Sequence, residues 1–545
     1  MFRSLTNLCQ KNLKSSYYLR RQILFFNHIN HNHINHYRFN STNKLSDFDG
    51  LVLGTYKDGS LSEIASKEIS NNIQQTIKQQ LQCAGVKGKL GEVRVLYGIG
   101  KEEGLPSKIA IVSLGTKSEN LKDSLNKARV AAAAGVRTLC DQGAKNIAID
   151  VMTSEHGVSE GATLGLYKPD KLKSIQNQEE SVKISPFGSL NSIQDFTWET
   201  GNSPANHMTP TIFTENVKSF LKDLPKVEVI VRDEKWAEEK KMGSFLSVGR
   251  GSNEPSKFLE IHYKGGKEGD KPLALVGGIS IKPSKHMSEM KIDMGGGAAV
   301  SAALYGIAKL ELPINVVVTV PLCENLLSGH ATKPGDVVIA MNGKSIEVDD
   351  TDAEGRLILA DALYYTSSTF KPHSLIDIAT LTYSIMAGLG TDKYSGVFSN
   401  SDKLWEELFK AGKITNDHFW RMPLDDFYLK AMTKSDVADY INCSDSDYGD
   451  ACNAAIFLKE FVYGLSDEGT VGKDITFIDK EKKDDVTKGN IIDKDADEIN
   501  KIRYAHIDMA GIMNTSEDSC CDVKGATGRP TRSIIEIARR IAVYK

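Results

Sequence analysis

Acidic side chains are crowded into the stretch VDDTDAEGRLILADAL, residues 348–363. Asp352 and Glu354 are two residues apart in a segment that is not yet helical, so their carboxylates can point the same way. Two carboxylates held about 4 Å apart repel each other by roughly 4 kcal/mol at an effective dielectric near 20, and a cation would offset that repulsion. Oxygen ligands suit Mg²⁺ and Mn²⁺ and also tolerate Zn²⁺. The stretch therefore predicts a divalent-ion site, with solvated surface charge as the alternative.

A second group of residues that could take part in chemistry lies upstream, in GGISIKPSKHMSEMKIDMGGGAAV, residues 277–300. Lys282 and Asp293 flank a turn-rich stretch, and Asp293 precedes three glycines that lead into a helix. Glycines allow the backbone to pack closely around whatever the aspartate holds. In the first stretch, Arg356 stands at the start of a helical run, where free N–H groups and the helix dipole favour an anion.

The elements around these residues predict an α/β fold. Apolar runs at 48–56, 108–115 and 146–152 are typical of buried strands, and the run between the last two has helical composition. A second series of strand-like runs follows from about residue 236, with helices between them: 257–265, 272–282, 314–322, 374–382, 394–400 and 504–513. Repeated strand and helix units predict mainly parallel sheets covered by helices, with ligands at the carboxyl ends of the strands.

The same series predicts a domain plan for the chain. We expect a leader at residues 1–44, a small N-terminal α/β domain at 45–208 and a larger C-terminal α/β domain at 236–545. Thr209-Pro210 opens a helix, with Thr as the cap and Pro in the first turn, and we interpret 209–235 as a connector. Residues 464–502 are strongly charged and are expected to be a solvated insertion.

Bulk composition excludes several kinds of partner. The 545 residues carry a formal net charge of −4 and are 40% hydrophobic, so there is no electrostatic footprint for nucleic acid or for an anionic membrane surface. No apolar run reaches the roughly 18 residues that a membrane-spanning helix needs. The eight cysteines include no C-x-x-C pair, which suits a reducing compartment better than a disulfide framework.

The leader has the composition of a mitochondrial transit peptide. No acidic side chain precedes Asp47, while basic residues, Ser, Asn and His are abundant. The sequence RFNST at 38–42 is similar to the arginine-flanked sites at which mitochondrial presequences are cut. We therefore expect import into the mitochondrial matrix. The alternative is a disordered Asn- and His-rich tail on a cytoplasmic protein.

The stretch at 350–357, DTDAEGRL, resembles the N-T-D-A-E-G-R-L signature of the leucine aminopeptidase (cytosol aminopeptidase) family. Further segments are similar to family segments and occur in the family's order: NSPANHMTP, MGSFLSVGRGS, FLEIHYKG, PLCENLLSGHATKPGDVV, FLKEFV and ATGRPTR. The resemblance runs from about residue 50 to the C-terminus. It implies a small N-terminal domain, a catalytic α/β domain, a homohexamer, and two divalent ions that activate water against the first peptide bond of a peptide.

The resemblance also implies roles for single residues. Asp293, Asp352 and Glu354 match metal ligands for ions such as Mn²⁺ or Zn²⁺. Lys282 matches the lysine that polarises the scissile carbonyl, and Arg356 matches the arginine that holds a bicarbonate as general base. Substrate-pocket positions are matched by Met290, Thr380 and Leu381.

This chain also departs from the family pattern. The family's V-G-K-G-x-T-F-D-S-G-G piece, with a lysine ligand and a bridging aspartate, is missing where Gly277-Gly278 pass directly into Ile279 and Lys282, a loss of roughly eight residues from a two-metal site. The remaining three carboxylates offer at most six oxygens, enough for one hard ion but poor for two. Tyr383 replaces a glycine and is expected to narrow the pocket.

Two further departures lie nearby. Asp350 replaces the signature's asparagine, which adds negative charge beside a site that has lost a cationic lysine. VGKDITFID at 471–479 resembles the lost piece, but its spacing is one residue longer and its surroundings are loop-like, so we do not expect Lys473 and Asp479 to restore the ligands.

Two hypotheses of function therefore stay open. The first is a mitochondrial metalloaminopeptidase that trims peptides with a free N-terminus, impaired by the lost ligands and working around one ion or two. The second is a catalytically silent hexamer that keeps the fold and serves as a structural or binding protein. The retained Lys282, Arg356 and carboxylates favour the first, while the lost bridging ligand and Tyr383 favour the second.

Overall fold

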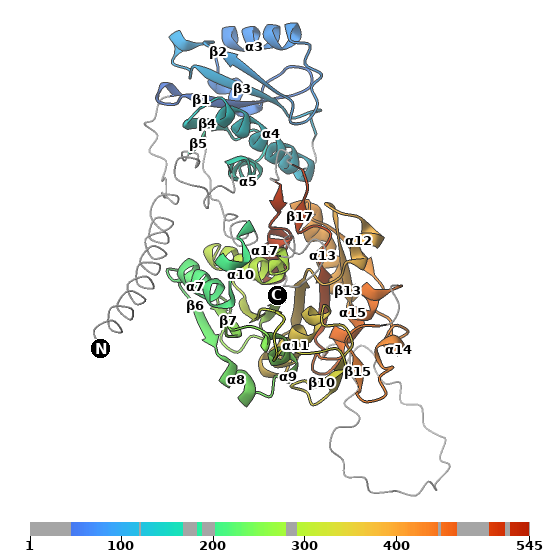
Figure 1. The fold of residues 1–545 in the computed structure, drawn as a ribbon. Helices are drawn as coiled ribbons and strands as arrows, with labels where there is room; N and C mark the ends of the chain where they lie inside the picture. The colour runs from blue at the N-terminus through green and yellow to red at the C-terminus, as the bar shows by residue number, and fades with distance from the viewer. Residues whose placement is uncertain are drawn as a thin grey trace, which may run out of the picture.

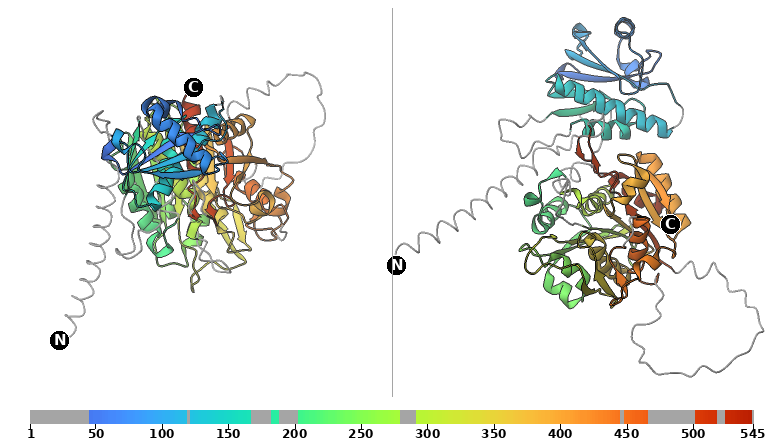
Figure 2. Two further views of the ribbon diagram at one scale, coloured as in Figure 1. Left: turned by 90° about the horizontal axis from the view of Figure 1, so that it is seen from above. Right: turned by 45° about the vertical axis from the view of Figure 1, so that its right-hand side comes forward.

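The computed structural model describes residues 45–118, 121–166, 182–187, 202–278, 291–444, 448–465, 501–517 and 524–543. The leader at 1–44 and most of the charged insertion, residues 466–500, lie outside the described residues. Figures 1 and 2 show a smaller N-terminal domain at one end of a larger domain that contains the rest of the described chain. No helix in the described ranges combines the length and the apolar character needed to cross a membrane.

The smaller domain is a five-stranded sheet with helices on both faces. Its strands lie in the order β2-β3-β1-β4-β5, and all neighbours are parallel except β2 and β3. Their bounds are β1 Gly50–Thr55, β2 Val93–Tyr97, β3 Lys108–Ser113, β4 Asn146–Asp150 and β5 Lys183–Phe187. Every residue of β1 is buried, which agrees with a strand that is covered on both faces.

Two apolar cores cover the two faces of this sheet. Ile73 and Ile77 of α3 pack with Leu51 and Leu53 of β1 on one face, while Ala132 of α4 packs with strand residues on the other. The helical elements are η1 Leu45–Asp47, α2 Glu63–Glu68, α3 Asn71–Cys83, η2 Lys101–Glu103, α4 Leu121–Asp141 and α5 Glu155–Leu166.

The larger domain is built on an eight-stranded sheet of order β14-β13-β16-β12-β8-β9-β7-β6. The four central strands β16, β12, β8 and β9 are parallel, as are β13 and β14, and the other neighbours are antiparallel. The bounds are β6 Val227–Arg232, β7 Lys257–Lys264, β8 Leu273–Gly277, β9 Asn315–Leu322, β12 Ser374–Ala379, β13 Tyr394–Ser399, β14 His418–Met422 and β16 Arg503–Asp508.

Helices cover both faces of the larger sheet. One apolar core joins it to α7, α10, α13 and α17, and a second joins it to α8, α9, α11 and α15. The helical bounds are η4 Ala205–His207, α7 Pro210–Leu221, α8 Glu234–Glu239, α9 Gly243–Gly249, α10 Gly295–Lys309, α11 Glu354–Phe370, α12 Ser384–Leu389, α13 Asp402–Thr415, α14 Leu429–Met432, α15 Asp450–Lys459 and α17 Thr531–Val543. The expected α/β class, with a mostly parallel main sheet, is confirmed.

Two small sheets complete the larger domain. The first has the order β10-β11-β15 and the second pairs β17 with β18. Their bounds are β10 Asp336–Ile339, β11 Ser345–Val348, β15 Tyr440–Ile441, β17 Asn514–Thr515 and β18 Gly525–Ala526. Strand β11 matters for the site because the acidic stretch follows it directly.

Residues 209–235, which we expect to connect the domains, contain α7 and β6. Helix α7 does start as expected, because the Thr209 side chain accepts a hydrogen bond from the backbone N–H of Ile212. However, Phe213, Val217 and Leu221 of this helix are buried in the core of the larger domain. Strand β6 pairs with β7 as the edge of the main sheet. Both elements therefore belong to the larger domain.

Candidate active site

The carboxyl ends of the parallel strands β8 and β12 are brought close to the start of α10. A Cβ on Gly277 would stand 2.5 Å from the backbone of Gly296, and a Cβ on Gly296 would stand 2.0 Å from the carbonyl oxygen of Ile378. Glycine is required at both positions because no side chain fits there. This close approach fixes Asp293, which precedes α10, beside the end of β12, where the Thr380 hydroxyl donates to the Asp293 carbonyl oxygen at 3.3 Å.

The acidic turn between β11 and α11 is held by one buried asparagine. Asn442 accepts hydrogen bonds from the backbone N–H groups of Asp349 at 2.8 Å and Asp350 at 3.2 Å. Its amide donates to the Asp350 carbonyl oxygen at 2.6 Å. Within the turn, the Asp350 carboxylate accepts from the N–H of Asp352 at 2.8 Å. The turn that carries Asp352 and leads to Glu354 is therefore pinned to the segment after β15.

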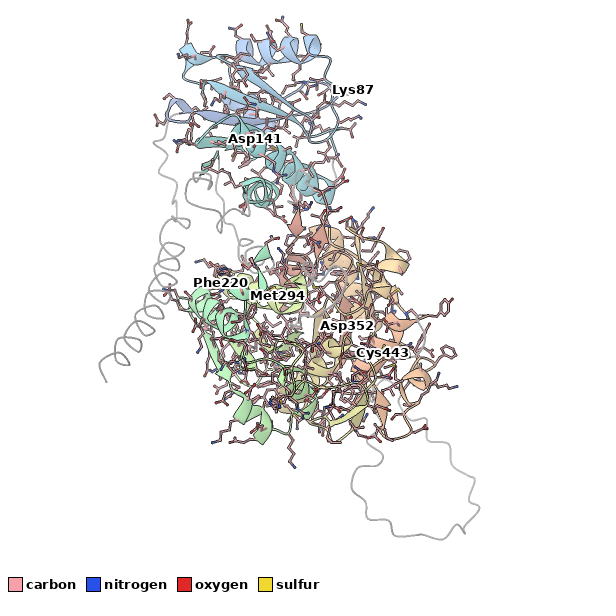
Figure 3. All side chains as sticks on the ribbon, viewed as in Figure 1. Lys87, Asp141, Phe220, Met294, Asp352 and Cys443 are labelled. Atoms are coloured by element: carbon pink, nitrogen blue, oxygen red, sulfur yellow. The ribbon has the colours of Figure 1, made fainter. Side chains whose placement is uncertain are left out.

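One small pocket gathers most of the residues expected at the site. Its cavity volume is about 20 Å³, which has room for about one water molecule. It is lined by Gly278, Asp293, Asp352, Ala353, Glu354, Gly355, Arg356, Ile358, Leu359, Ala379, Thr380 and Leu381. Figure 3 labels Asp352 within the larger domain. The three expected metal ligands, Arg356 and two expected substrate residues therefore share one pocket.

The charged groups of this pocket differ in burial. Glu354 is 2% exposed and Arg356 is 4% exposed, whereas Asp352 is exposed. The Asn325 amide donates to Glu354 Oε2 at 3.4 Å and to the Thr351 carbonyl oxygen at 2.9 Å. The negative charge of Glu354 also raises the pKa of Cys323, after the larger effect of burial on that thiol. Glu354 thus provides a buried acceptor, and Asp352 provides one that faces solvent.

Arg356 is paired with an aspartate that sequence patterns did not single out. Arg356 Nη2 lies 3.2 Å from Asp450 Oδ1, at the first residue of α15. The other Asp450 oxygen accepts from the Ser384 hydroxyl at 3.0 Å. Arg356 Nε and Nη1 are buried and make no hydrogen bond to any described residue. Two guanidinium nitrogens are therefore available to an additional acceptor.

A buried aspartate shapes the pocket wall. Asp508, at the end of β16, accepts hydrogen bonds from the backbone N–H groups of Leu381 at 3.3 Å and Thr382 at 3.1 Å, and from the Thr382 hydroxyl at 2.7 Å. Burial raises the pKa of Asp508, and the neighbouring His506 and these donors oppose that rise. Asp508 therefore fixes the segment that contributes Thr380 and Leu381 to the pocket.

Three other expected site residues are not among the described residues that line this pocket. Lys282 and Met290 lie in residues 279–290, outside the described part of the chain. Tyr383 is 82% exposed and does not line the pocket. The expected narrowing of the pocket by Tyr383 is therefore not found in this arrangement, because the ring projects into solvent from the turn before α12.

The donor chemistry fits a hard divalent ion, but the described residues do not form a complete cage. Asp293, Asp352 and Glu354 all line the pocket and supply the carboxylate oxygens that Mn²⁺ and Mg²⁺ prefer. Within the described ranges, no three His, Cys, Asp or Glu side chains are placed so that they could hold one metal ion. Any full ligand set therefore includes waters or residues outside those ranges.

Comparison with known proteins decides the family. Residues 195–535 match the catalytic domain of the cytosol aminopeptidase family, and residues 52–176 match its N-terminal domain. The chain belongs to the cytosol aminopeptidase family. The resemblance read from the motifs is thus confirmed, and with it the assignment to a family of metallo-exopeptidases.

Curated cytosol aminopeptidases are similar over nearly their whole length. The Dictyostelium discoideum protein is 38% identical over 555 residues, covering 96% of this chain and 98% of the relative. The Homo sapiens protein is 38% identical over 523 residues, covering 90% of this chain and 93% of the relative. The similarity therefore extends across both domains.

Solved structures show the same architecture. The bottromycin maturation enzyme BotP in complex with Mn has a TM-score of 0.71 at 25% identity, covering 91% of this chain and 99% of that chain. A mutant of tomato leucine aminopeptidase has a TM-score of 0.70 at 26% identity, covering 90% and 94%.

Three residues at this site could not be found from the sequence alone: Asn442, Asp450 and Asp508. Their partners are distant in sequence, since Asn442 is 92 residues from Asp350, Asp450 is 94 from Arg356 and Asp508 is 126 from Thr382. A local pattern carries no signal for such pairs. The one available clue was the position of Asp508 within the run 504–513, which predicted a buried strand.

Proposed function

We propose that this cytosol aminopeptidase family member is a slow metallo-exopeptidase that releases N-terminal amino acids from peptides and uses one divalent ion, Mn²⁺ or Zn²⁺. The observation that carries the proposal is the shared pocket of Asp293, Asp352, Glu354 and Arg356 at the carboxyl ends of parallel strands. Three carboxylates suit one hard ion completed by waters. The loss of the lysine and bridging aspartate ligands is the proposed reason for slow turnover.

The chain's own residues have distinct proposed roles. Asp293, Asp352 and Glu354 would contribute carboxylate oxygens to the ion, and waters or residues outside the described ranges would complete the ligand set, because the three carboxylates are not grouped around one point in the described structure. Arg356 offsets their negative charge from the same pocket wall. Thr380 and Leu381 would contact the first residue of the peptide. Lys282 would stabilise the negative charge that develops on the scissile carbonyl oxygen. The ion, when bound, supplies Lewis acidity and an activated water.

A second candidate function is a silent hexameric paralogue that serves as a structural or binding protein. Two observations favour it. No three metal-binding side chains converge in the described part of the chain, and Arg356 is already paired with Asp450. Both candidates include the homohexamer that the family resemblance implies.

Hydrolysis of a leucyl amide by purified protein supplied with Mn²⁺ or Zn²⁺ separates the two candidates. We expect an Asp352→Ala, Glu354→Ala double variant to lose at least about 100-fold in rate, because removal of metal ligands costs more than the 10- to 100-fold typical of residues behind them. Asp349→Ala is the matched control, because the Asp349 side chain is exposed and only its backbone N–H holds the turn. Equal rates for the unmodified protein and the double variant would establish the silent paralogue.

The number of ions is tested separately by equilibrium dialysis against Mn²⁺. We expect one ion per chain at saturation and none in the double variant. Two ions per chain would contradict the single-ion proposal while leaving the peptidase proposal intact.

We further propose that the protein acts in the mitochondrial matrix. The support is the acid-free, basic composition of residues 1–46. A fluorescent protein carrying residues 1–50 should enter mitochondria and lose the leader. Retention in the cytoplasm would contradict this location.

A further inference from the structure

Arg356 and Asp450 form an ion pair at the wall of the pocket. Arg356 is 4% exposed, so its guanidinium is largely removed from water and needs a counter-charge. Asp450 Oδ1 provides that charge at 3.2 Å from Arg356 Nη2. Arg356 reaches the pocket from α11, two residues after Glu354, while Asp450 does not line the pocket.

Asp450 is itself held from two sides. It is the first residue of α15, where the helix dipole favours a negative charge. Its second oxygen accepts from the Ser384 hydroxyl of α12 at 3.0 Å. Its side chain is 22% exposed, so the carboxylate is partly shielded from water. The fold therefore delivers this carboxylate to Arg356 in a fixed position.

We propose that Asp450 is a built-in counter-ion that positions Arg356 and competes with small dissolved anions for it. A carboxylate fixed by the fold loses no translational freedom on contact with the arginine, whereas a dissolved anion does. Bicarbonate, which the family resemblance places at this arginine, must therefore displace Asp450 or bind through the two remaining nitrogens. The inference rests on the proposed function only in locating the pocket, and it assigns Asp450 as a positioning residue.

The proposal is tested by thermal unfolding of the purified full-length chain. Sodium bicarbonate is titrated at pH 8 and constant ionic strength, with sodium chloride as the reference salt. We expect the unmodified protein to respond to bicarbonate no more than to chloride. Asp450→Asn should gain a bicarbonate-dependent rise in melting temperature, with an affinity at least about 10-fold higher, because one charge-assisted competitor has been removed.

Two further variants control this experiment. Asp402→Asn is matched to Asp450→Asn, because Asp402 is also the first residue of a helix and also pairs with an arginine, at 2.6 Å from Arg421. It should leave the bicarbonate response unchanged. Adding Arg356→Gln to Asp450→Asn should abolish the response, which would show that the anion binds at Arg356.

Ser384→Ala keeps the charge of Asp450 but removes its second hydrogen bond, so we expect a bicarbonate affinity between those of the unmodified protein and Asp450→Asn. This variant decides the question if Asp450→Asn does not fold. A bicarbonate response of the unmodified protein equal to that of either variant would overturn the proposal. The melting temperature is measured without turnover, so this outcome is independent of whether the protein hydrolyses peptides.

Discussion

Asp508 shows how a buried residue can control the pocket without lining it. Its two carboxylate oxygens accept from the backbone N–H groups of Leu381, Thr382 and Ala510 and from the Thr382 hydroxyl. Beside it, burial alone would lower the pKa of His506, but the Asp377 carboxylate at 2.6 Å and Asp508 together raise it. Strands β12 and β16 are therefore linked by a buried series of charged groups, Asp377, His506 and Asp508.

Asp508→Asn should destabilise the protein and loosen the segment that contains Leu381. The amide replaces one acceptor oxygen with a donor, so at least one buried N–H group loses its partner, at a cost of about 1–3 kcal/mol. The free energy of unfolding in denaturant measures this loss. In an active protein, KM for a leucyl amide should rise more than kcat falls. Asp392→Asn is the control, because Asp392 is exposed and its carboxylate accepts from the hydroxyl of its neighbour Thr391. Equal stability of the two variants would contradict this role.

Sequence reasoning found the residues that a motif holds together and missed those that the fold brings together. Asp352, Glu354 and Arg356 lie within one signature, and each lines the pocket. Asp450 could not be predicted, because its partner lies 94 residues away and the pair forms only when α15 packs near α11. The exposure of Tyr383 was likewise beyond the sequence, since its direction depends on the turn before α12.

Helix α11 carries Glu354 and Arg356, and a buried aspartate within it fixes the helix to its neighbours. Asp361 accepts from the backbone N–H of Phe245 in α9 at 2.8 Å and of Met341, just after β10, at 2.7 Å. Burial raises the pKa of Asp361 to about 7, although these backbone donors oppose the rise. The position of the helix therefore depends on a carboxylate that gains a proton near neutral pH.

The pKa of Asp361 predicts a pH dependence of stability. Its pKa in the folded state lies above its ordinary value of 3.8, so the folded state binds a proton that the unfolded state releases. Stability should therefore fall as pH rises from about 4 to about 7, by up to about 4 kcal/mol from this group. Since Asn does not titrate, the destabilisation caused by Asp361→Asn should be greater at pH 5 than at pH 8. Chemical denaturation at both pH values measures it, and a larger effect at pH 8 would refute the prediction.

Among the secondary-structure elements, the buried central strands could be predicted from the sequence, whereas the edge strands and short strands could not. The runs that gave β1, β8, β9, β12 and β16 are apolar because these strands are covered on both faces. The packing of α7 could not be predicted, because its apolar face is visible in the sequence but the core that buries it is not. The short strands β10 and β15 were missed because two to four residues give too little periodicity.

The two domains are joined by a buried cluster of charges. Glu160 of α5 pairs with Arg129 of α4 at 2.7 Å and with Arg532 of α17, which also lies 3.0 Å from Asp417. Figure 1 shows α4 and α5 on the side of the smaller domain that faces α17 and α13. Burial would raise the pKa of Glu160, but Arg532 and Arg129 hold it below its ordinary value. The carboxylate of Glu160 thus neutralises arginines from both domains.

Glu160→Gln should weaken the joint between the domains. The substitution removes the carboxylate that Arg129 and Arg532 share, while Arg532 keeps Asp417, so the loss should be at most the roughly 3–5 kcal/mol that breaking a buried ion pair costs. Guanidinium chloride unfolding followed by tryptophan fluorescence measures the loss. Glu63→Gln is the matched control: it removes an exposed partner of Lys67 and should change nothing measurable. Because Trp236, Trp405 and Trp420 lie in the larger domain, a loss of stability in the tryptophan signal would show that the smaller domain supports the larger one through this cluster. An unchanged midpoint would mean that the two domains unfold independently.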